Sequence, residues 1–132
     1  MTPACSDQEG MILIVDDEPL MTDLFVKAMT KRGFRVIAAH DGPTAIEIVR
    51  LRNMDLSLVI TDMTMPAMDG VTLSRELEKI APNLPVLIAT GLYADVEQLQ
   101  APPNVVGIVS KPYRASELTD TIRTILSVEE LP

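Results

Sequence analysis

The stretch that decides the fold is Met11–Val15 (MILIV), and three acidic residues follow it directly: Asp16, Asp17 and Glu18. Five consecutive apolar residues are typical of a strand that is covered on both faces, as in a parallel sheet. In open parallel sheets, ligands bind beyond the carboxyl ends of the strands. A buried strand that ends in three carboxylates therefore indicates a functional edge on an α/β sheet.

Four further apolar runs have the length and the β-branched content of strands: Arg35–Ala39, Leu56–Thr61, Pro85–Thr90 and Val105–Val109. Most of them are continuous rather than alternating, which again favours burial on both faces. The spacing of apolar residues between the runs predicts helices. These helices lie at Leu20–Met29, Ala45–Arg52, Leu73–Ile80, Asp95–Gln100 and Leu118–Leu126.

The first predicted helix has an apolar stripe at every fourth position, formed by Leu20, Leu24 and Ala28, with Phe25 and Met29 beside it. Such a stripe is typical of the helix face that packs on a core. Strand and helix alternate five times along the chain, which predicts right-handed crossovers. The expected fold is a doubly wound α/β fold, a five-stranded parallel sheet with helices on both faces.

The chain has 132 residues, 47% of them apolar, and its 19 acidic residues against 11 Lys and Arg give a net charge of −8. This length predicts one domain, at residues 11–127 between polar tails at 1–10 and 128–132. The negative charge opposes direct binding of nucleic acid. The single Cys5 excludes an internal disulfide. No apolar run is long enough for a membrane span, and the N-terminus lacks the basic and apolar regions of a signal peptide. We therefore expect a cytoplasmic protein without membrane insertion.

Polar residues also follow the other predicted strands: Asp62 comes after the third, Thr90 closes the fourth, and Lys111 lies just beyond the fifth. Because parallel strands end at one edge, these residues should meet the first acidic group there. Clustered carboxylates favour a bound cation, and oxygen ligands suit Mg²⁺. A carboxylate beside that metal can attack a phosphoryl group, whose charge a lysine and a threonine hydroxyl can stabilise.

Each of these residues has an ordinary structural interpretation when taken alone. An acidic triplet after a strand is most often a solvated loop or a helix cap, and Asp69-Gly70 is typical of a turn. The methionines of the following loop are typical packing residues. We expect His40 on the surface. The joint placement of the polar residues, rather than any one of them, favours a functional site.

Taken together, these motifs resemble those of bacterial response-regulator receiver domains of two-component signalling. The resemblance rests on ILIVDDEP at Ile12–Pro19, DMTMPAMDG at Asp62–Gly70, Thr90-Gly91 and Ser110-Lys111-Pro112. It covers the chain from Met11 to about Leu126. It implies a flavodoxin-like sheet with the strand order 2-1-3-4-5.

The resemblance also implies the chemistry of the site. Asp62 would accept a phosphoryl group from a phosphohistidine on a histidine kinase or a histidine phosphotransfer protein. Mg²⁺ would be bound by Asp16, Asp17, Asp62 and the backbone carbonyl of Thr64. The protein would be a signalling domain that assists its own phosphotransfer and dephosphorylation, and not an enzyme in the usual sense.

The same resemblance implies how the signal leaves the site. Thr90 and Lys111 would contact the phosphoryl oxygens and carry the switch, and the Lys111–Pro112 bond would be cis. A downstream protein partner would bind the face formed by the helix at Asp95–Gln100, the strand at Val105–Val109 and the helix at Leu118–Leu126. Whether the chain is a complete regulator or the receiver of a hybrid histidine kinase stays open.

Two positions depart from the family pattern. Receiver domains usually carry Tyr or Phe three residues before the lysine, where this chain has Ile108. An aliphatic side chain has no ring to rotate on phosphorylation, so we expect the loop Thr90–Tyr93 to carry the signal, with Tyr93 taking part. Leu92 is apolar and cannot orient an attacking water, which predicts a persistent phosphoaspartate.

Three other classes of protein fit less well. A haloacid-dehalogenase-like phosphatase needs a second aspartate two residues after its nucleophile, where this chain has Thr64. A flavodoxin-like cofactor binder needs a phosphate loop after the first strand, and Asp16-Asp17-Glu18 would repel a phosphate there. A receiver that only binds partners and is never phosphorylated would not need all of the polar residues named above.

Overall fold

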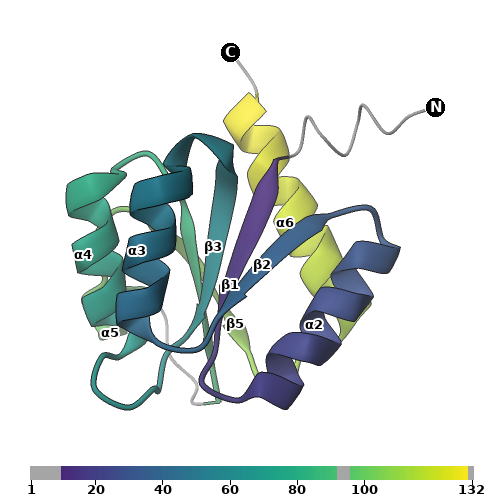
Figure 1. The fold of residues 1–132 in the computed structure, drawn as a ribbon, viewed down its shortest axis with the longest axis horizontal. Helices are drawn as coiled ribbons and strands as arrows, with labels where there is room; N and C mark the ends of the chain where they lie inside the picture. Colours follow the sequence, from purple (N-terminus) through teal and green to yellow (C-terminus); the bar gives the residue numbers. More distant parts are fainter. Residues whose placement is uncertain (1–9, 92–95, 131–132) are drawn as a thin grey trace.

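Five parallel strands form one sheet in the order β2-β1-β3-β4-β5, as predicted. The computed structural model describes residues 10–91 and 96–130. Figure 1 shows helices on both faces of the sheet. In chain order, the elements are β1 (Met11–Val15), α2 (Pro19–Lys31), β2 (Arg35–Ala39), α3 (Gly42–Arg52), η1 (Asn53–Asp55), β3 (Leu56–Asp62), α4 (Gly70–Ile80), β4 (Val86–Thr90), α5 (Val96–Leu99), β5 (Val105–Ser110) and α6 (Ala115–Glu130).

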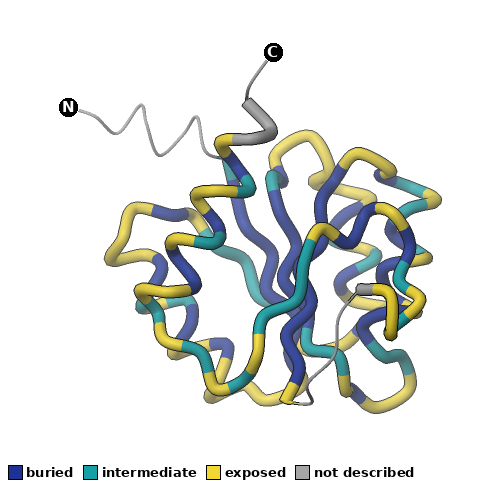
Figure 2. The backbone as a smooth tube through the Cα atoms, turned by 180° about the vertical axis from the view of Figure 1, so that it is seen from behind, coloured by how far each residue is buried: buried dark blue, intermediate teal, exposed yellow. Residues whose placement is uncertain are grey.

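The central strands are buried on both faces, which explains their continuous apolar runs. On β1, Leu13 and Val15 belong to a core that includes the inner sides of α3 and α4. Their neighbours Ile12 and Ile14 belong to a second core with α2 and α6. Because successive side chains of a strand point to opposite faces, one short run anchors both helical layers. Figure 2 shows the buried strands at the centre, surrounded by helices with exposed outer sides.

The apolar stripe predicted for the core side of α2 is wrong at Leu20 and Leu24, whereas Phe25 and Met29 are buried and Ala28 packs against the core. Leu20 is 78% exposed and Leu24 is 62% exposed. The buried residues of this helix are Thr22, Phe25 and Met29. Thr22 can be buried because its hydroxyl donates a hydrogen bond of 2.9 Å to the carbonyl of Pro19. A count of apolar positions does not identify a polar residue that is buried because its hydrogen bond is made within its own helix. The core face of α2 is therefore formed by Thr22, Phe25 and Met29 rather than by Leu20 and Leu24.

The last helix is longer than expected. It runs to Glu130, three residues into the segment 128–132 that the sequence suggested as a tail. Helix ends depend on local capping that apolar spacing does not report. Among the described residues, no helix combines the length and the apolar character that a membrane span requires.

Ala67 offers a test of backbone strain in the loop between β3 and α4. Its φ angle is +71°, a left-handed conformation that disfavours residues with a Cβ atom. We expect Ala67→Gly to raise the free energy of unfolding by about 0.5–1 kcal/mol, because glycine adopts this conformation without strain. Urea unfolding measures the change. Ala28→Gly, inside α2, is the control and should lower stability by about 1 kcal/mol. A loss of stability in Ala67→Gly would contradict the interpretation.

Candidate functional site

The carboxyl ends of the strands bring together the polar residues that the sequence singled out. Asp16 directly follows β1, and Asp62 is the last residue of β3. In the sheet register, Asp62 lies opposite Ala89 of β4, and Thr90 lies opposite Ser110 of β5. Lys111 follows β5 directly. The parallel register therefore places residues from four strands on one edge.

Asp16, Asp17 and Asp62 form an acidic cluster in which one carboxylate oxygen of each lies within 4.8 Å of the others. Asp16 is buried, Asp62 is half-buried and Asp17 is exposed. An octahedral Mg²⁺ ion with ligands at about 2.1 Å has its ligand atoms about 3–4 Å apart. The cluster is therefore close to the right size, and its hard oxygen donors and its opening to solvent at Asp17 fit an ion that keeps part of its water shell.

Lys111 supplies a positive charge to this acidic cluster. Its Nζ lies 3.1 Å from Oδ2 of Asp62 and 3.6 Å from Oδ2 of Asp16. Burial works to lower the pKa of Lys111, but the hydrogen bond to Asp62 and the charges of Asp16 and Asp62 outweigh it, so this pKa is raised. Lys111 is therefore held in its charged form, with its ammonium group directed at the Asp62 carboxylate.

The loop that carries Asp16 and Asp17 is tied to the end of β2. The amide of Asp16 donates to the carbonyl of Ala39 at 3.1 Å. The amide of Glu18 donates to Oδ1 of Asp16 at 3.0 Å, which turns the chain into α2. His40 is exposed, as expected, and its Nε2 lies 3.0 Å from the Thr22 hydroxyl. These bonds fix the backbone beside the acidic cluster.

The loop after Asp62 is held from both sides. The amide of Met63 donates to Ala89 at 2.8 Å, and the amide of Gly70 donates to the Met63 carbonyl at 2.8 Å. A Cβ atom on Gly70 would lie only 2.7 Å from the Asp62 carbonyl oxygen, so only glycine allows α4 to begin this close to the site. Asp69 caps α4 by accepting from the amide of Thr72 at 2.8 Å, as its turn sequence suggested.

Thr90 and Lys111 are joined through the backbone. The amide of Lys111 donates to the Thr90 carbonyl at 2.8 Å, and Thr90 is buried. The Lys111–Pro112 bond is cis, which confirms the expectation for this position. Thr64 lies two residues beyond Asp62 and is exposed. Contact of the Thr90 hydroxyl with a phosphoryl group, and of the Thr64 carbonyl with a metal ion, stay predictions.

Ile108 is half-buried and packs against the core beneath α3 and α4. Leu92 and Tyr93, on which the expected loop signal and the lifetime of the phosphoaspartate depend, lie outside the described residues. Their assigned roles stay predictions.

Tyr113 is a site neighbour to which the residue patterns assigned no role. It is half-buried and packs against the core beneath α2 and α6. Burial raises the pKa of its phenol, and the positive charge of Lys111 opposes the rise. The charges of Asp16 and Asp62 add to it, so the ring lies within electrostatic reach of the acidic cluster. Its position directly after Lys111-Pro112 was the available signal.

Comparisons with known proteins agree with this geometry. A sequence profile of the response regulator receiver domain matches residues 12–123. The chain is 34% identical over 116 residues to the response regulator receiver protein CpdR of Brucella abortus, covering 87% of this chain and 95% of CpdR. It is 31% identical over 120 residues to the sensor kinase CckA of the same organism, covering 90% of this chain but only 13% of CckA.

The fold has a close counterpart among solved structures. A response regulator receiver domain protein from Clostridium thermocellum superposes with a TM-score of 0.83 at 27% identity, covering 92% of this chain and 97% of that one. Three findings support the same family: the order of the strands in the sheet, the acidic cluster with its lysine, and the profile match over residues 12–123. The chain belongs to the response regulator receiver domain family and is a phosphoacceptor signalling domain of the two-component type.

Proposed function

We propose that Asp62 is the phosphoacceptor and that a phosphohistidine of a histidine kinase or histidine phosphotransfer protein is the donor. The observation that carries this assignment is the contact of 3.1 Å between Asp62 and the Lys111 ammonium group, beside the two other carboxylates. Asp62 lies at the strand end, where its side chain is 13% exposed and open to a partner. The ammonium group offsets the charge that would otherwise repel a phosphoryl donor.

In this proposal, a carboxylate oxygen of Asp62 attacks the phosphorus atom. The P–O bond forms as the P–N bond to the donor imidazole breaks, and the electron pair leaves with the imidazole nitrogen. Lys111 binds a phosphoryl oxygen as the charge shifts, and the Thr90 hydroxyl donates to another. The protein thus assists its own phosphorylation, and the same groups serve its dephosphorylation.

We assign Asp16, Asp17, Asp62 and the Thr64 carbonyl as the protein ligands of Mg²⁺. The ion would neutralise charge on the transferring group. The spacing of the acidic cluster and its partial exposure support this assignment. A haloacid-dehalogenase-like phosphatase is less well supported, because Thr64 stands where that chemistry needs an acid. Turnover of a phosphomonoester substrate by this chain would favour the phosphatase over the signalling domain.

The donor protein should dock on the exposed side of α2. This helix begins directly after the acidic cluster, and its outer face carries Leu20 (78% exposed), Leu24 (62%) and Met21 (39%). An apolar patch beside a reaction centre indicates a protein contact. We also propose that a downstream partner binds the face formed by α5, β5 and α6. The proposed location of the protein is the cytoplasm.

Incubation with acetyl phosphate and Mg²⁺ tests the phosphoacceptor. Intact-mass measurement should show a gain of one phosphoryl group that is lost in Asp62→Asn. Asp55→Asn is the control, since it removes an exposed carboxylate from η1, away from the acidic cluster. Modification that persists in Asp62→Asn would place the acceptor elsewhere. No modification under any donor or metal condition would favour a receiver that only binds partners.

Calorimetric titration with Mg²⁺ tests the metal ligands. Asp17→Asn should weaken Mg²⁺ binding by more than about tenfold, since second-shell changes alone cost that much in many metal sites. Asp23→Asn removes an exposed carboxylate of α2 outside the acidic cluster, and should leave the affinity unchanged. Equal affinities in the two variants would contradict the assignment.

Two equally exposed leucines provide a matched test of docking. Leu20 on α2 is 78% exposed, and Leu51 at the end of α3 is 76% exposed. With a donor kinase found by phosphotransfer profiling, Leu20→Ser should slow phosphotransfer several-fold, and Leu51→Ser should not. Phosphorylation by acetyl phosphate, which needs no docking, should be the same in both variants. If Leu51→Ser slows transfer as much as Leu20→Ser, then α2 is not the docking surface.

A further inference from the structure

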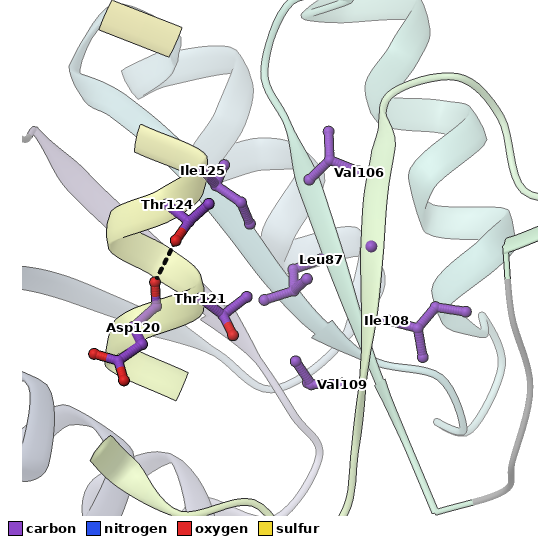
Figure 3. A pocket seen from close by; sticks show the side chains of 9 residues that line it. Leu87, Val106, Ile108, Val109, Asp120, Thr121, Thr124 and Ile125 are labelled. Carbon is purple, nitrogen blue, oxygen red and sulfur yellow. Dashed lines mark hydrogen bonds between the residues drawn. The ribbon is translucent and has the colours of Figure 1, made fainter. Parts of the chain in front are cut away.

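The two outer strands of the sheet are flanked differently. β5 pairs with β4 on one side, and a hollow of about 330 Å³ lies between it and α6. Figure 3 shows Val109 of β5 on one side of this hollow and Thr121 and Ile125 of α6 on the other. This part of the molecule belongs to the face already proposed for a downstream partner. β2, the outer strand at the other end of the sheet, belongs to neither proposed contact face.

Among the described residues, β2 (Arg35–Ala39) pairs only with β1. Its two faces are covered, since Val36 and Ala38 pack against the core beneath α2 and α6, and Ile37 packs against the core beneath α3 and α4. Figure 1 shows β2 between α2 and α3, and neither helix crosses in front of it. The side of β2 that faces away from β1 is therefore not covered by these helices, and we call it the open side of β2.

The hydrogen bonds to β1 determine which backbone groups of β2 face its open side. The amide of Asp16 donates to the carbonyl of Ala39 at 3.1 Å, so the N–H and C=O groups of Ala39 point toward β1. Because these groups alternate in direction along a strand, those of Val36 and Ala38 point away from β1. The open side of β2 therefore offers backbone donors and acceptors with which a second strand can pair.

The charged residues at the two ends of β2 have opposite signs. Arg35 begins the strand, and it lies on the face covered by α3, because Ile37 at the alternate position packs there. Asp41 follows the strand and begins α3 on the same face. Its Oδ1 accepts from the amide of Thr44 at 2.7 Å, and this hydrogen bond lowers the pKa of Asp41 and keeps it charged. Oδ2 of this exposed carboxylate can accept from a second partner.

This distribution of charge makes β2 complementary to an antiparallel copy of itself. An antiparallel copy brings Arg35 of each chain opposite Asp41 of the other, whereas a parallel copy would bring like ends together. Opposite charges across two paired strands stabilise the pairing, and like charges destabilise it. In the antiparallel arrangement that aligns these charges, Ala38 lies opposite Ala38. Its small side chain allows the two copies to approach each other.

We propose that a second copy of this chain pairs with the open side of β2, antiparallel and about a two-fold axis at Ala38. The N–H group of each Ala38 donates to the carbonyl of the other, and Arg35 of each copy contacts Asp41 of the other. The interface uses the same residues on both copies, as a two-fold axis requires. The two sheets then continue into each other. This pairing does not rest on the proposed phosphorylation of Asp62.

Light scattering on the full chain at rising concentration tests the dimer. The mass should rise from 14.4 kDa toward twice that value. Arg35→Glu places like charges opposite each other at both ends of the pairing, and should weaken the dimer by at least about tenfold. A mass of 14.4 kDa at every concentration that the protein tolerates would overturn the proposal.

Lys79→Glu is the matched control for Arg35→Glu. It makes the same change of net charge at an exposed lysine of α4, which packs against β4 and not against β2. It should change the affinity of the dimer by less than about twofold. Equal weakening in the two variants would show that net charge, and not the pairing of β2, controls the association, and would overturn the proposal.

Exchange of charge between two variants distinguishes a second copy from any other occupant. Asp41→Lys should weaken the dimer in the same way as Arg35→Glu. An equimolar mixture of the two variants should form a mixed dimer, because each chain then meets opposite charges at both ends of the strand. A mixture that stays monomeric overturns the proposed contacts. If Asp41→Lys fails to fold because α3 loses its cap, disulfide linking decides instead.

Disulfide linking tests the position of the two-fold axis in a Cys5→Ser background. Ala38→Cys should form a linked dimer under mild oxidation, because residues opposite each other in a hydrogen-bonded antiparallel pair have Cα atoms about 5.5 Å apart. Val36→Cys is the control on the same face of the same strand, since the proposed register places it about 13 Å from its own counterpart. Failure of Ala38→Cys to link, or equal linking of both variants, overturns the arrangement.

Discussion

Parallel strand register is the constraint on which the rest of this protein depends. Because all five strands run the same way, their carboxyl ends meet at one edge, and every loop that leaves this edge starts beside the others. Asp16, Asp62 and Lys111 are far apart in sequence, and the register of the strands brings them together. A shift of one residue in a strand would turn its side chains to the opposite face of the sheet. The buried apolar faces of the strands thus indirectly position the polar site.

Electrostatics then determines what this edge can do. Two aspartates share the ammonium group of Lys111, at 3.1 and 3.6 Å, and Asp17 adds a third carboxylate. In this arrangement the lysine partly offsets the charge of the acidic cluster, and a divalent cation would complete the balance. A phosphoryl group on Asp62 would add negative charge where Lys111 already points.

The surfaces of α2 and α6 meet near this edge. The exposed leucines of α2 follow the acidic cluster along the chain, and in the proposed function the donor docks there. Tyr113 lines one hollow with Met21 and Leu24 of α2 and another with Glu117 and Thr121 of α6. Both helices therefore adjoin the residue that lies two positions after Lys111.

The sequence by itself determined the strands, their alternation with helices, and the set of residues at the edge. Continuous apolar runs such as Met11–Val15 report burial on both faces, and the acidic and basic residues that follow them report the edge. It did not determine the buried face of α2, because Thr22 satisfies its hydroxyl within the helix and Leu20 can stay exposed. Nor did it show the electrostatic proximity of Tyr113 to the acidic cluster, or the hollow between β5 and α6. Those features depend on how separate elements pack in space, and only the tertiary structure decided them.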